Sequence, residues 1–475
     1  MTVTSSSPSA TTAQNDARIV SDALHYAEFD LSVPRDARRT LALAWLMLGL
    51  AALLASGVFS VLLVLSRTPQ LQHLFTVADF FRVALVVHVD LSVLVWFLAF
   101  GGTIWSLNGT LRFMPLAWLA FALAACGTVL MSVAPFGTSA VPVMANYIPV
   151  LDSPLFLAGL AVFGCGIALL CVRSMAAVIP VGARIEGGGA LRFGLNASMV
   201  ATAVAALAFV WSWSEVPRQL DARTYYELLF WGGGHVLQFS YTLLMLAGWI
   251  WLAAAIGARL PLSPRVVALL FGIALMSVFA TPVIYLAYDV ASVEHMRLQT
   301  WLMRFGGGLA IPPLALAVLW ALIRVRGIGD ESKPLRASLI SSLLLFSFGG
   351  AIGFLIEGSD VRIPAHYHGC IVGVTLAMMG VVYLVLPRLG FAAPRSRLAV
   401  WQPYLYGAGQ LLHITGLMWS GAYGVQRKVA GAEQVLRTPQ EMFGMGLMGL
   451  GGLVAIVGGV MFVIVVWRSL LNRHG

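Results

Sequence analysis

Long apolar runs separated by short polar loops dominate the pattern of hydrophobic positions along this chain. A run of about 20 apolar residues is long enough to cross the hydrocarbon layer of a bilayer. The pattern predicts an all-α integral membrane protein whose single domain, residues 39–470, contains twelve transmembrane helices. We place these helices near residues 39–66, 78–106, 114–134, 155–180, 194–213, 224–257, 263–289, 297–324, 335–357, 362–388, 400–421 and 442–468.

Both ends of the chain are expected in the cytoplasm. Residues 1–38 are rich in Ser, Thr, Asp and Arg and contain no apolar core, which favours a polar tail over a cleaved signal peptide. Most of the 29 Lys and Arg residues fall in segments that lie inside if the N-terminus is inside. Twelve helices then return residues 471–475 to the same side. The topology predicts a multi-pass protein of the bacterial inner (cytoplasmic) membrane.

Composition excludes several classes of protein. Hydrophobic residues make up 59% of the chain and charged residues 10%, whereas soluble domains carry about 25% charged residues. The net charge of +9 is not gathered in a basic run, so no nucleic-acid partner is expected. The four cysteines lie in apolar stretches without a C-x-x-C pair, which excludes a disulfide scaffold, a zinc ribbon and covalently attached c-type haem.

Histidines inside the predicted helices are the strongest indication of chemistry, because ionisable groups are costly in a bilayer. At 1.5 Å of rise per residue, one set of residues falls at a similar depth in the outer half of the membrane: His88, His235, His366, His368 and Asp289. Histidines from three helices at one depth predict a metal site. Surface or packing roles are expected for His25, His73, His413 and His474.

The pair His366 and His368 is the sharpest signal. Residues i and i+2 of an α-helix lie about 200° apart, so these imidazoles cannot bind one metal ion together. Each can ligate a separate centre, with the helix between the two. Neutral imidazole is a good axial ligand for haem iron, so the pair predicts two haems flanking one helix. The alternative is two unrelated histidines at the membrane boundary.

Three segments around these histidines carry a family resemblance. They are FRVALVVHVDLSVLVWFLAFGG (residues 81–102), FWGGGHVLQFSYT (230–242) and FSFGGAIGFLIEGSDVRIPAHYHGCIVGVTLAMMGVVYLVLPRLG (346–390). They resemble helix 2, helix 6 and helices 9 to 10 of subunit I of the haem-copper oxidase superfamily, in the branch of nitric oxide reductases and cbb-type oxidases. Twelve helices with cytoplasmic ends also match, so the resemblance extends over nearly the whole chain.

The resemblance implies a role for each histidine. His88 and His368 would be the two axial ligands of a low-spin haem, and His366 the proximal ligand of a high-spin haem with an open face. His235 would bind a non-haem metal opposite that face. Both haems are expected to be of b type. GAYGVQRKVAG (421–431) resembles the loop whose basic pair contacts haem propionates, which makes Arg427 and Lys428 candidates; the alternative is a solvated loop pair.

The chain departs from the family at the second metal. Most members supply two adjacent histidines at the outer end of helix 7, where this chain aligns Tyr288 and Asp289. The site would keep His235 and gain the Asp289 carboxylate, with Tyr288 as a further catalytic candidate. Carboxylate oxygen suits iron better than copper, so iron is expected and copper is the alternative. The other reading of Asp289 is a surface carboxylate at a helix end.

Three further residues are candidates to complete the metal's ligand set. They are Gln238, Glu294 and His295, of which His295 is expected in the loop after helix 263–289.

A second departure concerns oxygen chemistry. Oxygen reductases of this superfamily use a tyrosine joined to a metal-site histidine, and the two positions where the branches carry it hold Phe239 and Pro282 here. Tyr285 and Tyr288 lie near enough to keep the oxygen alternative open. Coupling two NO molecules needs only two electrons, which a haem iron and a non-haem metal can hold. The pattern therefore leans toward nitric oxide.

A third departure is the missing proton route from the inside. Helix 6 beyond His235 contains no carboxylate, and helix 8 contains no Lys, Thr or Ser over residues 306–323, although hydroxyls occur on helix 9. Proton pathways in membranes need titratable or hydroxyl groups. We therefore expect proton uptake from the outer side, through Glu227, Glu294 and Glu357, without pumping.

The sequence leads to one principal hypothesis and two alternatives. The first is a nitric oxide reductase-like catalytic subunit with two haems and a substituted non-haem metal site. It would receive electrons from a separate cytochrome c or cupredoxin-like subunit, or from a quinol. The alternatives are a cbb-type terminal oxygen reductase and a haem-binding sensor or buffer of NO that has lost turnover.

Overall fold

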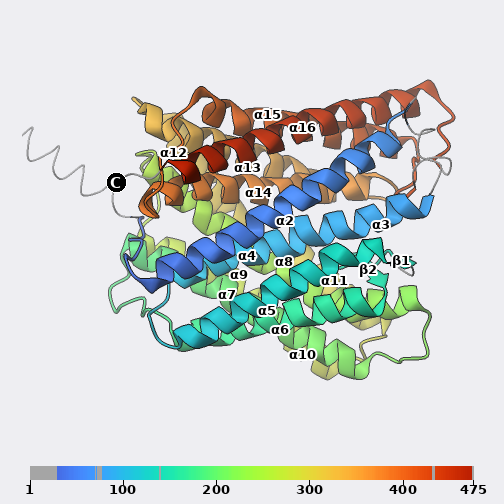
Figure 1. Cartoon of the computed structure of the whole chain (residues 1–475), viewed down its shortest axis with the longest axis horizontal. Helices are drawn as coiled ribbons and strands as arrows, with labels where there is room; N and C mark the ends of the chain where they lie inside the picture. Colours follow the sequence, from blue (N-terminus) through green and yellow to red (C-terminus); the bar gives the residue numbers. More distant parts are fainter. Residues whose placement is uncertain (1–28, 70, 72–77, 138–140, 430–433, 473–475) are drawn as a thin grey trace, which may run out of the picture.

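Twelve long helical segments lie along one common direction in the computed structural model of this chain (Figure 1). The structure describes residues 29–69, 71, 78–137, 141–429 and 434–472, and counts of elements refer to these. The segments are α2 (Ala37–Arg67), α3 with η2 and α4 (Ala78–Val89, Asp90–Val95, Trp96–Leu107), α5 (Met114–Val133), α6 (Pro154–Ala176), α7 (Gly187–Glu215), α8 (Ala222–Ala255), α9 with α10 (Pro264–Val278, Ala280–Ala287), α11 with α12 (Val293–Gly306, Ile311–Arg324), α13 (Lys333–Gly353), α14 (Arg362–Arg388), α15 (Arg397–Ala422) and α16 (Pro439–Leu471). The remaining elements are short: η3 (Ala134–Phe136), η4 (Asp330–Ser332), β1 (Val141–Val143) and β2 (Val150–Asp152).

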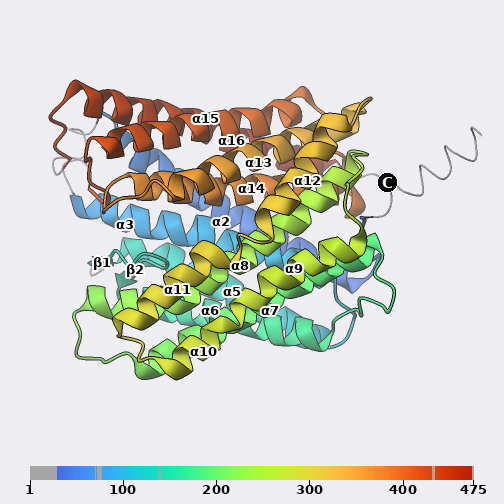
Figure 2. The ribbon, with the colours of Figure 1, turned by 180° about the vertical axis from the view of Figure 1, so that it is seen from behind.

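The prediction of an all-α membrane protein with twelve helices is confirmed. Within the described residues, eleven segments are long and apolar enough to span a bilayer. The exception is α15, whose apolar sequence is interrupted by Gln402, Gln410 and His413, yet it packs along α16 (Figures 1 and 2). Most of the predicted tails, residues 1–38 and 471–475, lie outside the described residues, as do His25, His73 and His474.

The most deeply buried spans are α8 and α14. Their side chains are covered along almost the whole membrane-spanning stretch, and α8 lies at the centre of the bundle in both views (Figures 1 and 2). These are the helices that carry His235 and the pair His366 and His368. Three of the predicted ligands therefore stand on the two most deeply buried helices, while His88 is on α3.

Two spans are interrupted close to candidate residues. A six-residue π-helix, Asp90–Val95, follows His88 directly and separates α3 from α4; single π turns inside α-helices are frequent at functional sites. The span of α11 and α12 breaks over residues 307–310, where glycines are followed by Pro312 and Pro313. Because proline lacks an N–H, it fits the first turn of α12 but not a continuous helix.

One short hairpin lies beside the helices. Strands β1 and β2 pair antiparallel, with Val141 opposite Asp152. The loop between the strands carries Asn146 and Tyr147, and the Tyr147 ring packs against Gly234 of α8. The hairpin therefore places a loop residue next to the central helix.

Candidate functional site

Four histidines share one hydrogen-bond arrangement. In each, Nδ1 faces a backbone carbonyl, which can only accept a hydrogen bond, so Nδ1 carries the proton. The acceptors and distances are Trp231 O for His235 (2.6 Å), Gly349 O for His366 (2.8 Å), Pro364 O for His368 (2.8 Å) and Ser56 O for His88 (3.1 Å). Each Nε2 therefore has a free lone pair, the form in which histidine binds metals.

Ser56 contacts His88 Nδ1 through both its hydroxyl and its backbone carbonyl. Its hydroxyl donates to the His88 carbonyl oxygen (3.0 Å), so it can accept from His88 Nδ1 (2.9 Å). The Ser92 hydroxyl also donates to the His88 carbonyl (2.6 Å), one turn along the π-helix. The ring of His88 is thus oriented by α2 and by its own helix.

His366 and His368 face different neighbours, as their i, i+2 spacing predicts. The His366 ring lies against α13 at Gly349 and Gly353. The ring of His368 lies 5.1 Å from that of His413 on α15. Two separate sites therefore flank α14.

The His368 side of α14 gathers further groups. His88 interacts electrostatically with both His368 and His413. His413, which was expected to pack in its helix, is buried and donates from Nδ1 to Met448 O (2.9 Å). Arg67, at the end of α2, also acts on His368 and His413 and binds the Gln434 side chain. Arg67 was not predicted from the sequence, although it is a basic residue at the end of the first long apolar run.

These residues fit haem iron on the observations above. His88 and His368 come from two helices into one region, and each offers a neutral imidazole with a free Nε2. His366 offers the same on the opposite side of α14. A bound haem would supply a redox-active iron, which neutral imidazoles ligate axially.

His235 is nearly inaccessible and lies among aromatic rings. Its ring centroid is 4.5 Å from that of Tyr147 and 4.9 Å from that of Trp231, and 1% of the residue is exposed. Burial raises the pKa of Tyr147, so its phenol stays protonated at neutral pH. His235 therefore has one nitrogen without a hydrogen bond, and its ring is buried among aromatic side chains.

The structure separates the other candidates for the second metal. Tyr288, Asp289 and Glu294 are exposed, and the Asp289 carboxylate accepts from the Ala291 N–H (2.7 Å). The expectation that His295 lies in a loop is wrong: it is in the first turn of α11, because Ser292 caps that helix and starts it earlier than predicted. His295 is buried and interacts electrostatically with both His235 and Asp289.

No cluster of three or more His, Cys, Asp or Glu residues with metal-binding geometry occurs in the part of the chain that the structure describes. A second-metal site at His235 would therefore take at most two ligands from these residue types and the others from different groups or bound water.

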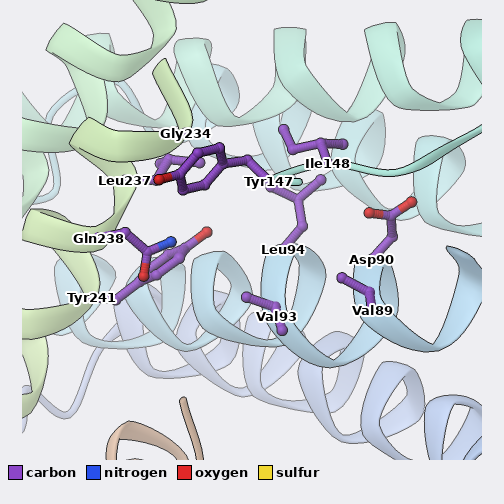
Figure 3. Close-up of a pocket in the computed structure, with 10 residues that line it drawn as sticks. All are labelled: Val89, Asp90, Val93, Leu94, Tyr147, Ile148, Gly234, Leu237, Gln238 and Tyr241. Carbon is purple, nitrogen blue, oxygen red and sulfur yellow. The ribbon is translucent and has the colours of Figure 1, made fainter. Parts of the chain in front are cut away.

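Gln238 lines a small cavity instead of facing the other candidates. Asp90, Tyr147, Gln238 and Tyr241 point into or border this space between α8 and the π-helix (Figure 3), whose volume is about 20 Å³. That is room for about one water molecule. Both Asp90 carboxylate oxygens are buried without a hydrogen-bond partner among the described residues. Sequence reasoning missed Asp90, although a carboxylate two residues after His88 was a visible signal.

Arg427 and Lys428 have protein partners at the outer loop. Lys428 Nζ donates to Met144 O (2.6 Å) and Asn146 Oδ1 (3.1 Å), while Arg427 Nε donates to Ser359 Oγ (3.3 Å). Burial, followed by the charge of Arg427, lowers the pKa of Lys428 to about 8. Lys428 is therefore anchored to the hairpin and is not a solvated loop residue.

Glu227, a predicted proton-entry group, joins the same network. Its carboxylate accepts from the backbone N–H of Asn146 (3.0 Å) and from the Asn146 side chain. Glu357 is exposed, and its backbone carbonyl accepts from Arg362.

Tyr285 pairs with His295. The two rings are perpendicular with centroids 4.6 Å apart, and the Tyr285 hydroxyl shares a hydrogen bond with Ser212 Oγ (2.7 Å). By contrast Phe239, four residues after His235, packs at the end of α11 beside Gly306.

Comparison with known proteins agrees with this arrangement. Residues 40–461 match the family described as Cytochrome C and Quinol oxidase polypeptide I. An uncharacterized protein of Rickettsia prowazekii is 29% identical over 514 aligned positions, covering 94% of this chain and 98% of the relative. An uncharacterized protein of Aquifex aeolicus is 26% identical, covering 76% and 88%.

A solved structure supports the same fold. It is a haem-copper terminal oxidase dimer studied by cryo-electron microscopy, with a TM-score of 0.68 at 15% identity, covering 93% of this chain and 86% of that one. The family match over most of the chain, the helical bundle and the histidines on α8 and α14 lead to one conclusion: this multi-pass membrane protein belongs to the cytochrome c and quinol oxidase polypeptide I family, subunit I of the haem-copper oxidases, and is a redox catalytic subunit.

Proposed function

We propose that the protein is a nitric oxide reductase-like catalytic subunit. The reaction is 2 NO + 2 e⁻ + 2 H⁺ → N₂O + H₂O, which balances with two electrons and two protons. The two haems and the non-haem metal supply the redox chemistry when bound. His88 and His368 would hold the low-spin haem, His366 the high-spin haem and His235 the non-haem metal, with further ligands from the α10 to α11 region.

The chain's own residues position these centres and exclude water. Each of the four histidines is held by a carbonyl at Nδ1, so the ligand nitrogen does not need to lose a proton. The aromatic rings of Tyr147 and Trp231 cover His235. A dry, preorganised site strengthens electrostatic interactions with the reacting molecules.

The observation that carries the choice of NO is the residue four positions after His235, which is a phenylalanine. At the position where one branch of the oxygen reductases has its reactive tyrosine stands Phe239, packed against the end of α11. Without a tyrosine there, this site has no obvious fourth electron for cleaving O₂, while NO coupling needs only two.

One observation favours oxygen reduction as the second candidate function. Tyr285 lies in ring contact with His295, so a tyrosine and a histidine do meet near His235. If this pair supplied the fourth electron, a cbb-type oxygen reductase would be the better description.

Electrons are proposed to arrive from a separate cytochrome c or cupredoxin-like subunit, or from a quinol.

Protons are proposed to enter from the outer side through Glu227, Glu294 and Glu357. We propose that both termini lie in the cytoplasm of a bacterium, with the helical bundle in its inner membrane. Interior pH during turnover in oriented proteoliposomes tests the proton route; alkalinisation of the cytoplasmic side would contradict it.

Substrate consumption by the reduced, purified protein tests the proposed function. We expect N₂O from NO and slow or no O₂ consumption. Exchange of His235 for alanine is expected to lower N₂O formation at least about 100-fold, because even loss of a residue that only supports a metal ligand costs 10–100-fold. Val457→Ala, exposed on α16, is the matched control. Fast O₂ consumption with no N₂O would favour the second candidate.

A further inference from the structure

His295 is a buried histidine whose hydrogen-bonding needs are unmet. Only 1% of the residue is exposed, and neither ring nitrogen makes a hydrogen bond of ordinary geometry with the described residues. One ring nitrogen lies close enough to the Tyr288 backbone for a hydrogen bond of poor geometry, and the other nitrogen has no partner among the described residues. A buried polar group without a partner is destabilising, and a ligand at this nitrogen would remove that penalty.

Gln299, one turn further along α11, is also a buried polar residue with an unpaired nitrogen. It is fully buried, its Oε1 accepts from Thr281 Oγ1 (3.4 Å), and its Nε2 has no partner among the described residues. Residues i and i+4 share one face of a helix, so His295 and Gln299 present two unsatisfied polar groups on the same side.

This face of α11 meets the part of α8 that carries His235. α11 crosses α8 in Figure 2, and Trp231 Nε1 on α8 donates to Met296 O, the residue after His295 (3.0 Å). The Trp231 ring also contacts His235, and His295 is within electrostatic range of His235. The Tyr285 ring touches His295, and its hydroxyl reaches Gly232 of α8.

Asp289 lacks these properties. It is exposed, and its carboxylate is engaged as the cap of the turn before α11, at the N–H of Ala291. A metal at Asp289 would have to compete with this hydrogen bond and with solvent, whereas a metal at His295 satisfies a nitrogen that otherwise has no partner.

We propose that His295 is the second protein ligand of the non-haem metal beside His235, and that the Gln299 amide is the hydrogen-bond donor next to it. The inference rests on the proposed function, because it completes the metal site that this function requires. His235 of α8 is kept, and the single imidazole of His295 on α11 takes the place of the histidine pair that the family resemblance implies for helix 7. Imidazole binds both iron and copper well, so a metal analysis of the purified protein is needed to identify the bound metal.

Metal and haem content of purified variants tests the assignment. The wild-type chain and Val293→Ala, an exposed change in the same helical turn, are expected to contain two haems and one non-haem metal per chain. His295→Ala is expected to keep both haems and lose the non-haem metal, and Asp289→Asn, which retains a capping oxygen, is expected to keep all three. Retention of the metal in His295→Ala would overturn the inference.

A rescue experiment guards against a general loss of folding. If His295→Ala loses haem as well, the variant His295→Gly is tested with added imidazole. We expect imidazole to restore both the non-haem metal and the haem spectrum. Without imidazole, His295→Gly is expected to remain without the non-haem metal. Failure of imidazole to restore the metal in a chain that retains haem would reject His295 as the ligand. Absence of the second metal from the wild-type chain itself would reject the proposed function, so the two failures are distinguishable.

Discussion

The tautomer of a histidine decides whether it can bind a metal. A proton held on Nδ1 by a carbonyl leaves Nε2 free, and His88, His235, His366 and His368 all have this form. His413 has it as well, through Met448 O. A hydrogen bond from Nδ1 to a carbonyl is therefore not enough to identify a metal ligand. His413 and His368 must be distinguished by their positions relative to the haem.

The two haem sites are expected to respond separately to mutation. Under the proposed assignment, His88→Ala should remove the low-spin haem and leave one haem per chain, because that haem would need both His88 and His368. His366→Ala should remove the high-spin haem, for which His366 is the proposed ligand. Optical and paramagnetic resonance spectra of the reduced and oxidised variants measure the two populations.

His413→Ala is the matched control for these variants. It lies beside His368 but is assigned no axial bond, so the low-spin signal should persist. Loss of the low-spin signal in His413→Ala with its retention in His88→Ala would contradict the assignment.

At this scale the sequence allowed the candidate ligands to be proposed, but it did not predict their contacts. The depth and spacing of His88, His235, His366 and His368 were enough to single them out. The burial of His295 was not predictable, because it depends on where Ser292 starts α11. Asp90 and Arg67 carried visible signals that were not used.

Helix packing at α15 and α16 depends on residues without side chains. A Cβ at Gly416 would lie 2.4 Å from the backbone nitrogen of Met448, and one at Gly409 equally close to Ala455 N. Small residues let membrane helices approach this closely. Because Met448 O also orients His413, this contact reaches the haem side of α14.

Gly416→Leu is therefore expected to destabilise the protein by about 1–3 kcal/mol, the usual cost of overpacking, and to lower its thermal unfolding temperature in detergent. Gly446→Ala on the same helix pair has no atom within 4 Å of its added Cβ and should be neutral. Equal unfolding temperatures for the two variants would show that the close contact does not matter.

Among the elements, the apolar spans could be predicted because bilayer thickness fixes their length. The π-helix after His88, the break over residues 307–310 and the β1–β2 hairpin could not, since they follow from packing between distant segments. Of these elements, the hairpin has the largest effect on the candidate site. Its loop places Tyr147 against His235 and accepts a hydrogen bond from Lys428.

On the scale of the whole molecule, the two most buried helices carry His235, His366 and His368, and α3 brings His88 to them (Figures 1 and 2). This arrangement explains why family membership was predictable from three short segments. The substrate is a finer question, because it depends on a few residues around His235 and not on the bundle.

The most direct test of the account is a count of haem and non-haem metal in the purified protein, paired with N₂O production from NO on the same sample. The account predicts two haems, one non-haem metal and sustained N₂O formation. Two haems without a second metal and without N₂O would contradict it and favour a sensor or buffer of NO. Copper with rapid O₂ consumption would contradict it in favour of an oxygen reductase.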